Sequence, residues 1–268
     1  MSGVPNAPPP GGAWTLPLAE TRDVAAGTRW LEFERPAGVE VEPGHFFMLA
    51  PASPSAAVFL GRPFSIGDVR NGGWRFLLRA LGRGTAWLGS LDAGTELRVV
   101  GPLGRPFRRM AAPVHRIVAG GIGLAPFFYL ARRLKAEQPA ARVELFYGER
   151  TAAGHTRFDD EEASLFDRTE RFTDDGSEGA AGTVVGGIVD RADSGVAWYA
   201  CGPHPMLRAL AFLFEEHGVT GAQFSLEERM ACGFGVCQAC IVPSRGASPR
   251  YRLLCTEGPV LDPRVVSW

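Results

Sequence analysis

Four cysteines near the C-terminal end constrain this chain more than any other feature of its sequence. They are Cys232, Cys237, Cys240 and Cys255, and their spacing is C-x4-C-x2-C-x14-C. The C-x4-C-x2-C run is typical of [2Fe-2S] sites, in which four thiolates hold two bridged iron ions. A structural zinc site is the alternative, although the ligand pairs of such sites usually begin with C-x2-C. The spacing therefore predicts that these four cysteines ligate a [2Fe-2S] cluster.

The fifth cysteine, Cys201, makes the count odd, which does not fit a disulfide framework. Clustered thiols that hold metal belong in a reducing compartment, so we expect a cytoplasmic protein. Residues 1–13 are rich in proline and lack the apolar core of a secretory signal, and we expect them to form a disordered leader. No uninterrupted apolar run is long enough to cross a membrane.

Composition excludes two broad classes of protein. The chain has 28 Lys plus Arg against 29 Asp plus Glu, a net charge of -1, which argues against a nucleic-acid binder that relies on a basic face. Its hydrophobic content of 46% is enough to bury a sizeable core, which excludes wholesale disorder.

Residues 14–110 have the pattern of an all-β domain. Short apolar or alternating segments, bounded by glycine-rich turns, recur about every ten residues, at 28–34, 44–49, 63–66, 74–79 and 96–100. This spacing predicts an antiparallel β-barrel or sandwich, interrupted by one short helix at about 86–91.

Residues 111–220 have a different pattern, in which strands alternate with helices. Buried strands are expected at 116–119, 143–147, 170–173 and 197–200, and helices at about 126–136 and 205–217. That order predicts a parallel-sheet α/β domain. Residues 221–268, rich in Cys and Gly, are too few to bury a core alone, so we expect a small module stabilised by its metal site.

Two segments of the barrel suit a flavin nucleotide. In Arg62-Pro63-Phe64-Ser65 the arginine can pair with a diphosphate and the serine can hydrogen-bond a flavin ring edge. Downstream of Arg79, Gly84-Thr85 opens the short helix, whose N–H groups suit a phosphate. Arg-Pro-x-Ser by itself is equally compatible with a plain β-turn.

The α/β domain carries two glycine-containing turns that follow strands. The segment 120–126, Gly-Gly-Ile-Gly-Leu-Ala-Pro, opens a helix, which is the context of a dinucleotide-phosphate loop, although it is not G-x-G-x-x-G. A simple glycine-rich turn is the alternative. Cys201-Gly202-Pro203 ends another strand, where substrate rings bind in parallel sheets. Inert packing is the alternative for Cys201.

Nucleotide selectivity is left open by the two residues that follow the strand at 143–147. Glu149 could bind a ribose 2′-hydroxyl and so favour NAD. Arg150 could bind a 2′-phosphate and so favour NADP.

These motifs, in this order, resemble the ferredoxin-NADP reductase superfamily and, within it, the electron-transfer subunits of class 1B dihydroorotate dehydrogenases. The resemblance spans roughly Trp14 to Asp262. Besides the segments above, it rests on the sequences at 101–104, 173–177 and, most specifically, 228–233. Residues 105–107, Arg-Pro-Phe, depart from the family pattern, in which a small polar residue and Gly are common.

The resemblance implies FAD on the barrel, NAD(H) on the α/β domain and a [2Fe-2S] cluster on the C-terminal module. It also implies a partner, the FMN-containing catalytic subunit that oxidises dihydroorotate, in an assembly of two plus two chains. Electrons would pass from that subunit through the cluster and FAD to NAD+, so the cluster carries single electrons and the flavin converts between one and two.

Carried over by position, the family's cofactor-binding residues fall on three sets in this chain. The flavin would be held by Arg62, Pro63, Phe64, Ser65, Leu77, Leu78, Arg79, Gly84 and Thr85. The nicotinamide nucleotide would be lined by Gly120, Gly121, Gly123, Leu124, Ala125, Pro126, Gly202 and Pro203. The catalytic position facing the nicotinamide would be Cys201, and the four clustered cysteines would ligate the cluster.

Two other kinds of protein would show some of the same sequence motifs. One is the small FAD/[2Fe-2S] subunit of another NAD(P)H oxidoreductase complex, of the ferredoxin:NADP, sulfite or hydrogenase type; a monooxygenase reductase would need a longer ferredoxin domain. The other, from a different class, is a non-redox binding protein with a zinc-stapled tail, which would be colourless.

Overall fold

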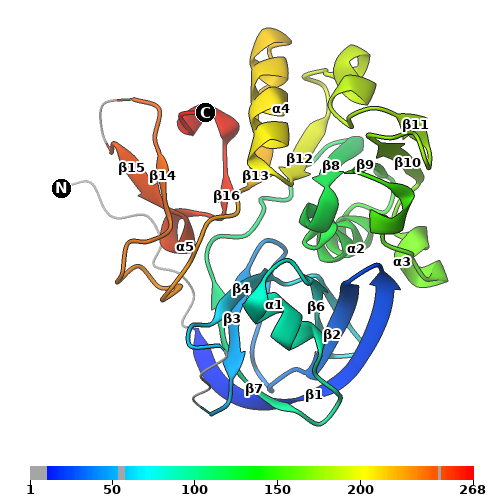
Figure 1. Cartoon of the computed structure of the whole chain (residues 1–268). Helices are drawn as coiled ribbons and strands as arrows, with labels where there is room; N and C mark the ends of the chain where they lie inside the picture. The colour runs from blue at the N-terminus through cyan, green and yellow to red at the C-terminus, as the bar shows by residue number, and fades with distance from the viewer. Residues whose placement is uncertain (1–10, 54–57, 247–248) are drawn as a thin grey trace.

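The computed structural model describes residues 11–53, 58–246 and 249–268. Figure 1 shows its three parts, with the N-terminal strands below, an α/β layer above and the C-terminal segment at one side. Residues 1–10 of the expected leader lie outside the described residues, whereas Gly12 and Ala13 already belong to a strand. The expected boundary after residue 13 therefore falls inside a strand.

The N-terminal domain is an antiparallel sheet with the strand order β4-β3-β7-β1-β2-β6-β5 in the described residues. It curls strongly, and α1 (Arg83–Gly89) packs beside β6 (Figure 1). The two edge strands, β4 and β5, are not paired with each other, so the expected barrel is an open half-barrel. The strands are β1 (Gly12–Ala25), β2 (Thr28–Glu34), β3 (Phe46–Pro51), β4 (Arg62–Ser65), β5 (Asp68–Arg70), β6 (Gly73–Arg79) and β7 (Glu96–Leu103).

The second domain is built on a mostly parallel sheet, as the alternation of strands and helices predicted. Its order is β11-β10-β9-β8-β12-β13-β16 in the described residues, and only β16 runs antiparallel. The strands are β8 (Val114–Gly120), β9 (Arg142–Glu149), β10 (Arg168–Thr173), β11 (Ala180–Ala181), β12 (Ala197–Cys201), β13 (Gln223–Ser225) and β16 (Val260–Leu261).

Helices cover this sheet. They are α2 (Phe127–Glu137), α3 (Asp160–Ser164) and α4 (His204–Glu216), with short 3-10 turns η1 (Gly121–Leu124), η2 (Ala152–Gly154), η3 (Gly186–Arg191) and η4 (Pro263–Val265). In α4 the buried residues Leu207, Leu210, Ala211 and Phe214 recur at helical spacing and pack on the sheet. No helix in the described ranges is long and apolar enough to span a membrane.

The C-terminal segment is closely integrated with the α/β domain. Its first and last strands, β13 and β16, extend the α/β sheet, so the expected boundary at residue 221 cuts through that domain. The rest, β14 (Ile241–Pro243), β15 (Tyr251–Leu253) and α5 (Leu254–Glu257), forms a hairpin and a helical turn. Cys240 and Cys255 share one buried cluster with Met48 and Leu103 of the half-barrel. The segment therefore completes its core with the other two domains.

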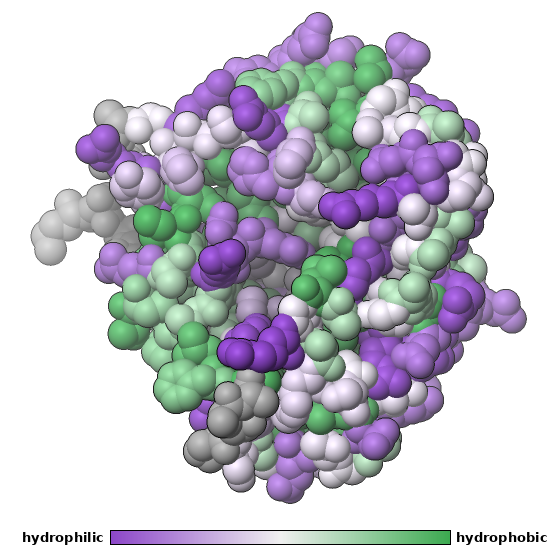
Figure 2. Space-filling view, in the orientation of Figure 1, coloured by the Kyte–Doolittle hydropathy of each residue, from purple (hydrophilic) through white to green (hydrophobic). Residues whose placement is uncertain are grey.

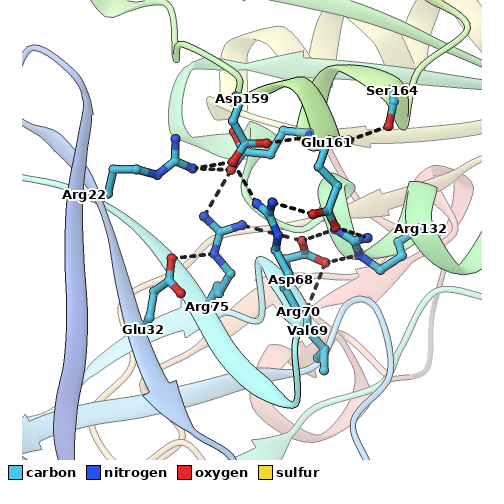
Figure 3. Close-up of polar contacts among 11 residues, drawn as sticks. Arg22, Glu32, Asp68, Val69, Arg70, Arg75, Arg132, Asp159, Glu161 and Ser164 are labelled. Atoms are coloured by element: carbon cyan, nitrogen blue, oxygen red, sulfur yellow. Dashed lines mark hydrogen bonds and ion pairs between the residues drawn. The ribbon is translucent and has the colours of Figure 1, made fainter.

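A network of ion pairs joins the half-barrel to the α/β domain, as Figure 3 shows. Arg75 of β6 lies between Glu32, 2.8 Å away, and Glu162 of α3, 3.1 Å away. Arg132 of α2 holds the fully buried Asp68 of β5 at 2.6 Å. Because buried charges are tolerated only when paired, these contacts specify how the two domains meet.

Candidate functional site

A cleft of about 200 Å³ lies where the half-barrel, the α/β domain and the C-terminal segment meet. The half-barrel contributes one wall, from β4, β6 and the start of α1. The opposite wall comes from the η1 turn and from the segment that follows β13. The lining residues are Phe46, Pro63, Phe64, Ser65, Leu77, Arg79, Leu81, Thr85, Ile122, Ala125, Leu226, Glu227, Glu228, Met230 and Pro259.

Most of the residues expected to hold the flavin meet at this cleft. Pro63, Phe64, Ser65, Leu77 and Thr85 line it. Alternation along β6 places the neighbouring Leu78 side chain in the half-barrel core instead, fully buried, so only its backbone is available to a ligand.

Arg62 and Gly84, expected to bind the flavin diphosphate together, do lie together. The Arg62 guanidinium covers Gly84 so closely that a Cβ there would come within 2.6 Å of Nε. Arg62 Nη1 donates to the Leu60 carbonyl at 2.7 Å. A cation beside the first turn of a helix is a suitable place for a phosphate.

The two glycine turns of the α/β domain pack backbone against backbone. A Cβ on Gly123 would lie 2.4 Å from the Cys201 carbonyl oxygen, and one on Gly202 would lie 3.0 Å from the Gly120 backbone. Pro203 and Met206 close over Gly120. The glycines are thus required for close approach, and the two turns form one surface at the carboxyl edge of the sheet.

Within the η1 turn, the side chains point in two directions. Ile122 and Ala125 face the cleft, whereas Leu124 is fully buried in the α/β core. Pro126 caps α2. The Leu124 side chain is therefore not available to a nucleotide, and the assignment of Leu124 to the nucleotide site stays a prediction.

Cys201 is fully buried, and its thiol does not line the cleft. Burial and the nearby Glu227 raise the pKa of the Cys201 thiol well above its usual value, although Ser225 hydrogen-bonds to it. The neutral form of the thiol is therefore favoured, and the side chain lies inside the core. Its catalytic role stays a prediction.

The segment after β13 supplies cleft residues that the sequence analysis did not assign. Glu227, Glu228 and Met230 belong to the Ser-Leu-Glu-Glu-Arg-Met run that leads into the cluster cysteines. Glu227 is exposed to solvent within the cleft, and partial desolvation by the surrounding protein raises the pKa of its carboxyl. The signal in the sequence that could have identified these residues is the pair of adjacent acidic residues before the cysteine loop.

Arg79 and Glu149, expected at two different cofactors, contact each other. Arg79 also lines the cleft, but its guanidinium reaches across to the α/β domain. The Glu149 side chain is only 6% exposed, and both of its oxygens accept hydrogen bonds, from Arg79 and from Tyr147. Glu149 is thus engaged within the protein, whereas Arg150 is exposed.

The four clustered cysteines come together as two pairs. The Cys237 backbone N–H donates to Cys232 Sγ at 3.5 Å, and the Cys255 N–H donates to Cys240 Sγ at 3.4 Å. Within the described residues, no three His, Cys, Asp or Glu side chains converge on a point that could hold one metal ion. Two thiol pairs suit two iron ions with two ligands each better than a single tetrahedral zinc.

The geometry of the cysteine loop also suits a negatively charged iron-sulfur cluster. Gly233 and Gly235 have φ of +86° and +88°, which lets the chain turn tightly around the sulfurs. Burial acts to raise the pKa of Cys232, but N–H donation from Cys237, Phe234 and Val236 outweighs it and brings the pKa to about 6. Burial and the neighbouring Cys240 raise the pKa of Cys255 to about 12. A bound metal would replace both protons.

Comparison with known families agrees with this geometry. Residues 227–266 match the iron-sulfur cluster binding domain of dihydroorotate dehydrogenase B, and residues 117–211 match the oxidoreductase NAD-binding domain. A protein of Geobacillus kaustophilus, the dihydroorotate dehydrogenase B (NAD(+)) electron transfer subunit, is 40% identical over 82% of this chain and 84% of its own. A homolog of that subunit from Aquifex aeolicus is 34% identical over 83% and 84%.

Solved structures share the fold at lower identity. An NADH-dependent reduced ferredoxin-NADP oxidoreductase aligns with a TM-score of 0.79 and 23% identity, covering 96% of this chain and 91% of that one. The ferredoxin reductase of carbazole 1,9a-dioxygenase aligns with a TM-score of 0.70 and 22% identity, covering 80% and 69%.

Fold and site together define an oxidoreductase with a ferredoxin-reductase-like fold and an iron-sulfur domain. Within that class, the chain belongs to the family of dihydroorotate dehydrogenase B electron transfer subunits. The resemblance, the fold class and the expected cofactors FAD, [2Fe-2S] and NAD(H) are thereby confirmed, and the reading as a zinc-stapled binding protein is wrong.

Proposed function

We propose that this chain passes electrons from an FMN-containing dihydroorotate dehydrogenase catalytic subunit to NAD+, in a cytoplasmic assembly of two plus two chains. The proposal rests on one observation: the segment that lines the cleft leads directly into the loop that carries the cysteine pairs. Leu226, Glu227, Glu228 and Met230 line the cleft, and Cys232 follows two residues after Met230. A redox centre held by that loop would be close in sequence and in space to one held in the cleft.

The half-barrel residues would hold FAD. Arg62 and the N–H groups at Gly84 and Thr85 would bind its diphosphate, and the Ser65 hydroxyl would hydrogen-bond the ring edge. Phe64 and Leu77 would pack on the ring and exclude water. Bound there, the flavin supplies a carrier that can exchange electrons singly or as a hydride.

The α/β turns would hold the nicotinamide nucleotide. Gly121, whose Cβ position meets only Arg79 at 3.4 Å, would let a diphosphate approach the backbone before α2. Gly120 and Gly123 would shape that surface by letting the turn pack closely on Gly202 and Pro203. Cys201 would lie beneath this surface, where it would support the turn and the nearby Glu227. We propose NAD(H) as the nucleotide, because the relatives named above carry NAD(+) in their names.

The decisive experiment is co-purification with the catalytic subunit encoded in the same genome. The complex should contain FAD, FMN, iron and sulfide, and should reduce NAD+ when dihydroorotate is added. A complex that reduces NADP+ or ferredoxin but does not respond to dihydroorotate would instead support an oxidoreductase of the ferredoxin:NADP type. A zinc-containing protein without iron or flavin would contradict both.

A further inference from the structure

The guanidinium of Arg79, at the end of β6, is held firmly but not fully occupied. Its Nε donates to Thr28 Oγ1 at 2.9 Å, and its Nη2 donates to Glu149 Oε1 and to the Gly154 carbonyl. Its Nη1 makes only the longer bond, 3.2 Å, to Glu149 Oε2. Because a guanidinium carries five N–H groups, one N–H of Nη1 has no acceptor among the described residues.

That nitrogen faces the glycine turn of the α/β domain. A Cβ built on Gly121 would lie 3.4 Å from Nη1 of Arg79, and apart from its chain neighbours it would meet no other protein atom within 4 Å. Gly121 also has a φ of +57°, which favours glycine over residues with a side chain. The turn therefore presents bare backbone beside a cation that belongs to the other domain.

The glycine turn has no cation of its own. Residues 117–131, which include the turn and the start of α2, contain no Lys, Arg or His, and neither do residues 201–203. The first cation along α2 is Arg132, whose guanidinium is bonded to Asp68 and Glu161. Backbone N–H groups can hold part of the charge of a diphosphate, but arginine is the side chain best suited to the rest.

The Arg79 guanidinium can be reached from the cleft. Arg79 and Ile122 of the turn line the same cleft, and the Arg79 side chain is 16% exposed. Figure 2, in the orientation of Figure 1, shows a hollow in the surface between the half-barrel below and the α/β layer above, with hydrophilic residues at its rim. A ligand lying on the glycine turn would thus meet a guanidinium that is already fixed in position.

We propose that the Arg79 side chain binds the diphosphate of the nicotinamide nucleotide, across the domain boundary. This inference rests on the proposed function, which lays that nucleotide on the turn at 120–126. It moves to the nucleotide a side chain that the sequence analysis assigned to the flavin, while the backbone of β6 stays in the flavin wall. Glu149 holds the guanidinium in place, and the nucleotide would bridge the half-barrel and the α/β domain.

Arg79→Gln and Glu149→Gln break the same ion pair, so together they separate a ligand contact from a structural one. The NAD+ dissociation constant of the FAD-loaded chain is measured by calorimetry. Loss of the guanidinium should weaken NAD+ binding about tenfold or more. Glu149→Gln keeps an acceptor of the same shape and removes a negative charge that competes with the phosphates, so NAD+ should bind as tightly as before or more tightly. ADP-ribose, which has the diphosphate but no nicotinamide, should respond in the same way.

Three further measurements exclude other causes. Arg70→Gln is the matched control, because Arg70 also joins the half-barrel to the α/β domain, 2.7 Å from Asp159, but does not line the cleft. This variant should bind NAD+ normally. Flavin content per chain after gel filtration should be the same in Arg79→Gln as in the unaltered chain. Arg79→Lys keeps the charge and should recover part of the lost affinity.

Four outcomes would overturn the assignment of Arg79. Equal weakening by Arg79→Gln and Glu149→Gln would attribute the effect to domain docking. Loss of flavin from Arg79→Gln with unchanged NAD+ affinity would return the side chain to the flavin, and unchanged binding of both would leave it no ligand. Where Arg79→Gln does not fold, full NAD+ affinity in Arg79→Lys would count against the inference. An unaltered chain that binds no NAD(H) would instead overturn the proposed function.

Discussion

The guanidinium of Arg79 donates two hydrogen bonds to the carboxylate of Glu149. Nη2 lies 2.6 Å from Oε1, and Nη1 lies 3.2 Å from Oε2. Arg79 ends β6 of the half-barrel and Glu149 ends β9 of the α/β domain, so the pair spans the domain boundary at the cleft. Nε of Arg79 donates to Thr28, and Nη2 also donates to the Gly154 carbonyl. Four donated bonds fix the guanidinium in place.

We expect this pair to contribute measurably to the docking of the two domains. Because both side chains are mostly buried, removing one partner leaves a charge without compensation. A double-mutant cycle with Arg79→Gln and Glu149→Gln should give a coupling free energy of about 1–3 kcal/mol in urea unfolding. The pair between Arg109 and Glu137 also joins separate elements but is more exposed, and its cycle should give a smaller value. A coupling near zero for Arg79 and Glu149 would contradict the prediction.

The contact between the two glycine turns predicts a steric effect. In Gly123→Ala the new methyl would lie 2.4 Å from the Cys201 carbonyl, a backbone atom that can move only if the turn moves. We expect a loss of about 1–3 kcal/mol in unfolding free energy, together with weaker NAD+ binding. Gly82→Ala is the control, since a Cβ there meets no protein atom and its φ of -157° suits any residue. Equal stability of the two variants would contradict the predicted steric clash at Gly123.

Glu227 predicts a pH-dependent stability. Its pKa is raised in the folded protein, so the neutral form is favoured and stability falls as pH rises through the unfolded pKa toward the raised folded one. Glu227→Gln cannot ionise and should therefore raise Tm at pH 8 but not at pH 4. The adjacent Glu228→Gln, which lines the same cleft, is the control. A gain from Glu227→Gln at acid pH that vanishes at pH 8 would reverse the sign and refute the argument.

Local patterns predicted much of this architecture. The cysteine spacing, the glycine turn at 120–126 and the strand–helix alternation each depend on neighbours in the chain. The parallel sheet, the NAD-binding domain and the iron-sulfur domain are confirmed, whereas the ligand roles of the individual residues stay predictions. The strand β1 escaped prediction because Pro17 and a run of polar residues interrupt its alternation, while pairing with both β2 and β7 holds it in place.

Other features depend on contacts that no local pattern encodes. Arg79 and Glu149 lie 70 residues apart, and their pairing follows from how two domains dock. Glu227 follows β13, whose place in the sheet depends on pairing with β12 and with β16, which comes some 35 residues later. For Cys201, position at the carboxyl end of a parallel strand was predictable, but which way its thiol points depends on core packing.

The flavin assignment predicts a specific defect in Arg62→Ala. Losing the guanidinium that lies over Gly84 removes the only cation we assign to the flavin diphosphate, so the protein should lose FAD on dialysis. Flavin content per chain, measured by absorbance after gel filtration, should fall well below that of the unaltered protein, while iron content is retained. Arg29→Ala, which removes a half-barrel arginine paired with Asp23, is the control. Full flavin occupancy in Arg62→Ala would reject the assignment.

The division of labour between the two redox sites predicts that they can be separated by mutation at Cys237. This thiol is exposed, and its backbone N–H supports Cys232, so Cys237→Ser should lose one ligand without disturbing the cleft. Iron and sulfide should fall to a small fraction of the normal content, and transfer of electrons from the catalytic subunit should stop. Dye reduction by NADH should persist, because it needs only the flavin and nucleotide sites. Cys201→Ala, a thiol outside the two cysteine pairs, should keep its full iron content. Parallel loss of iron and of dye reduction in Cys237→Ser would show that the two sites are not independent.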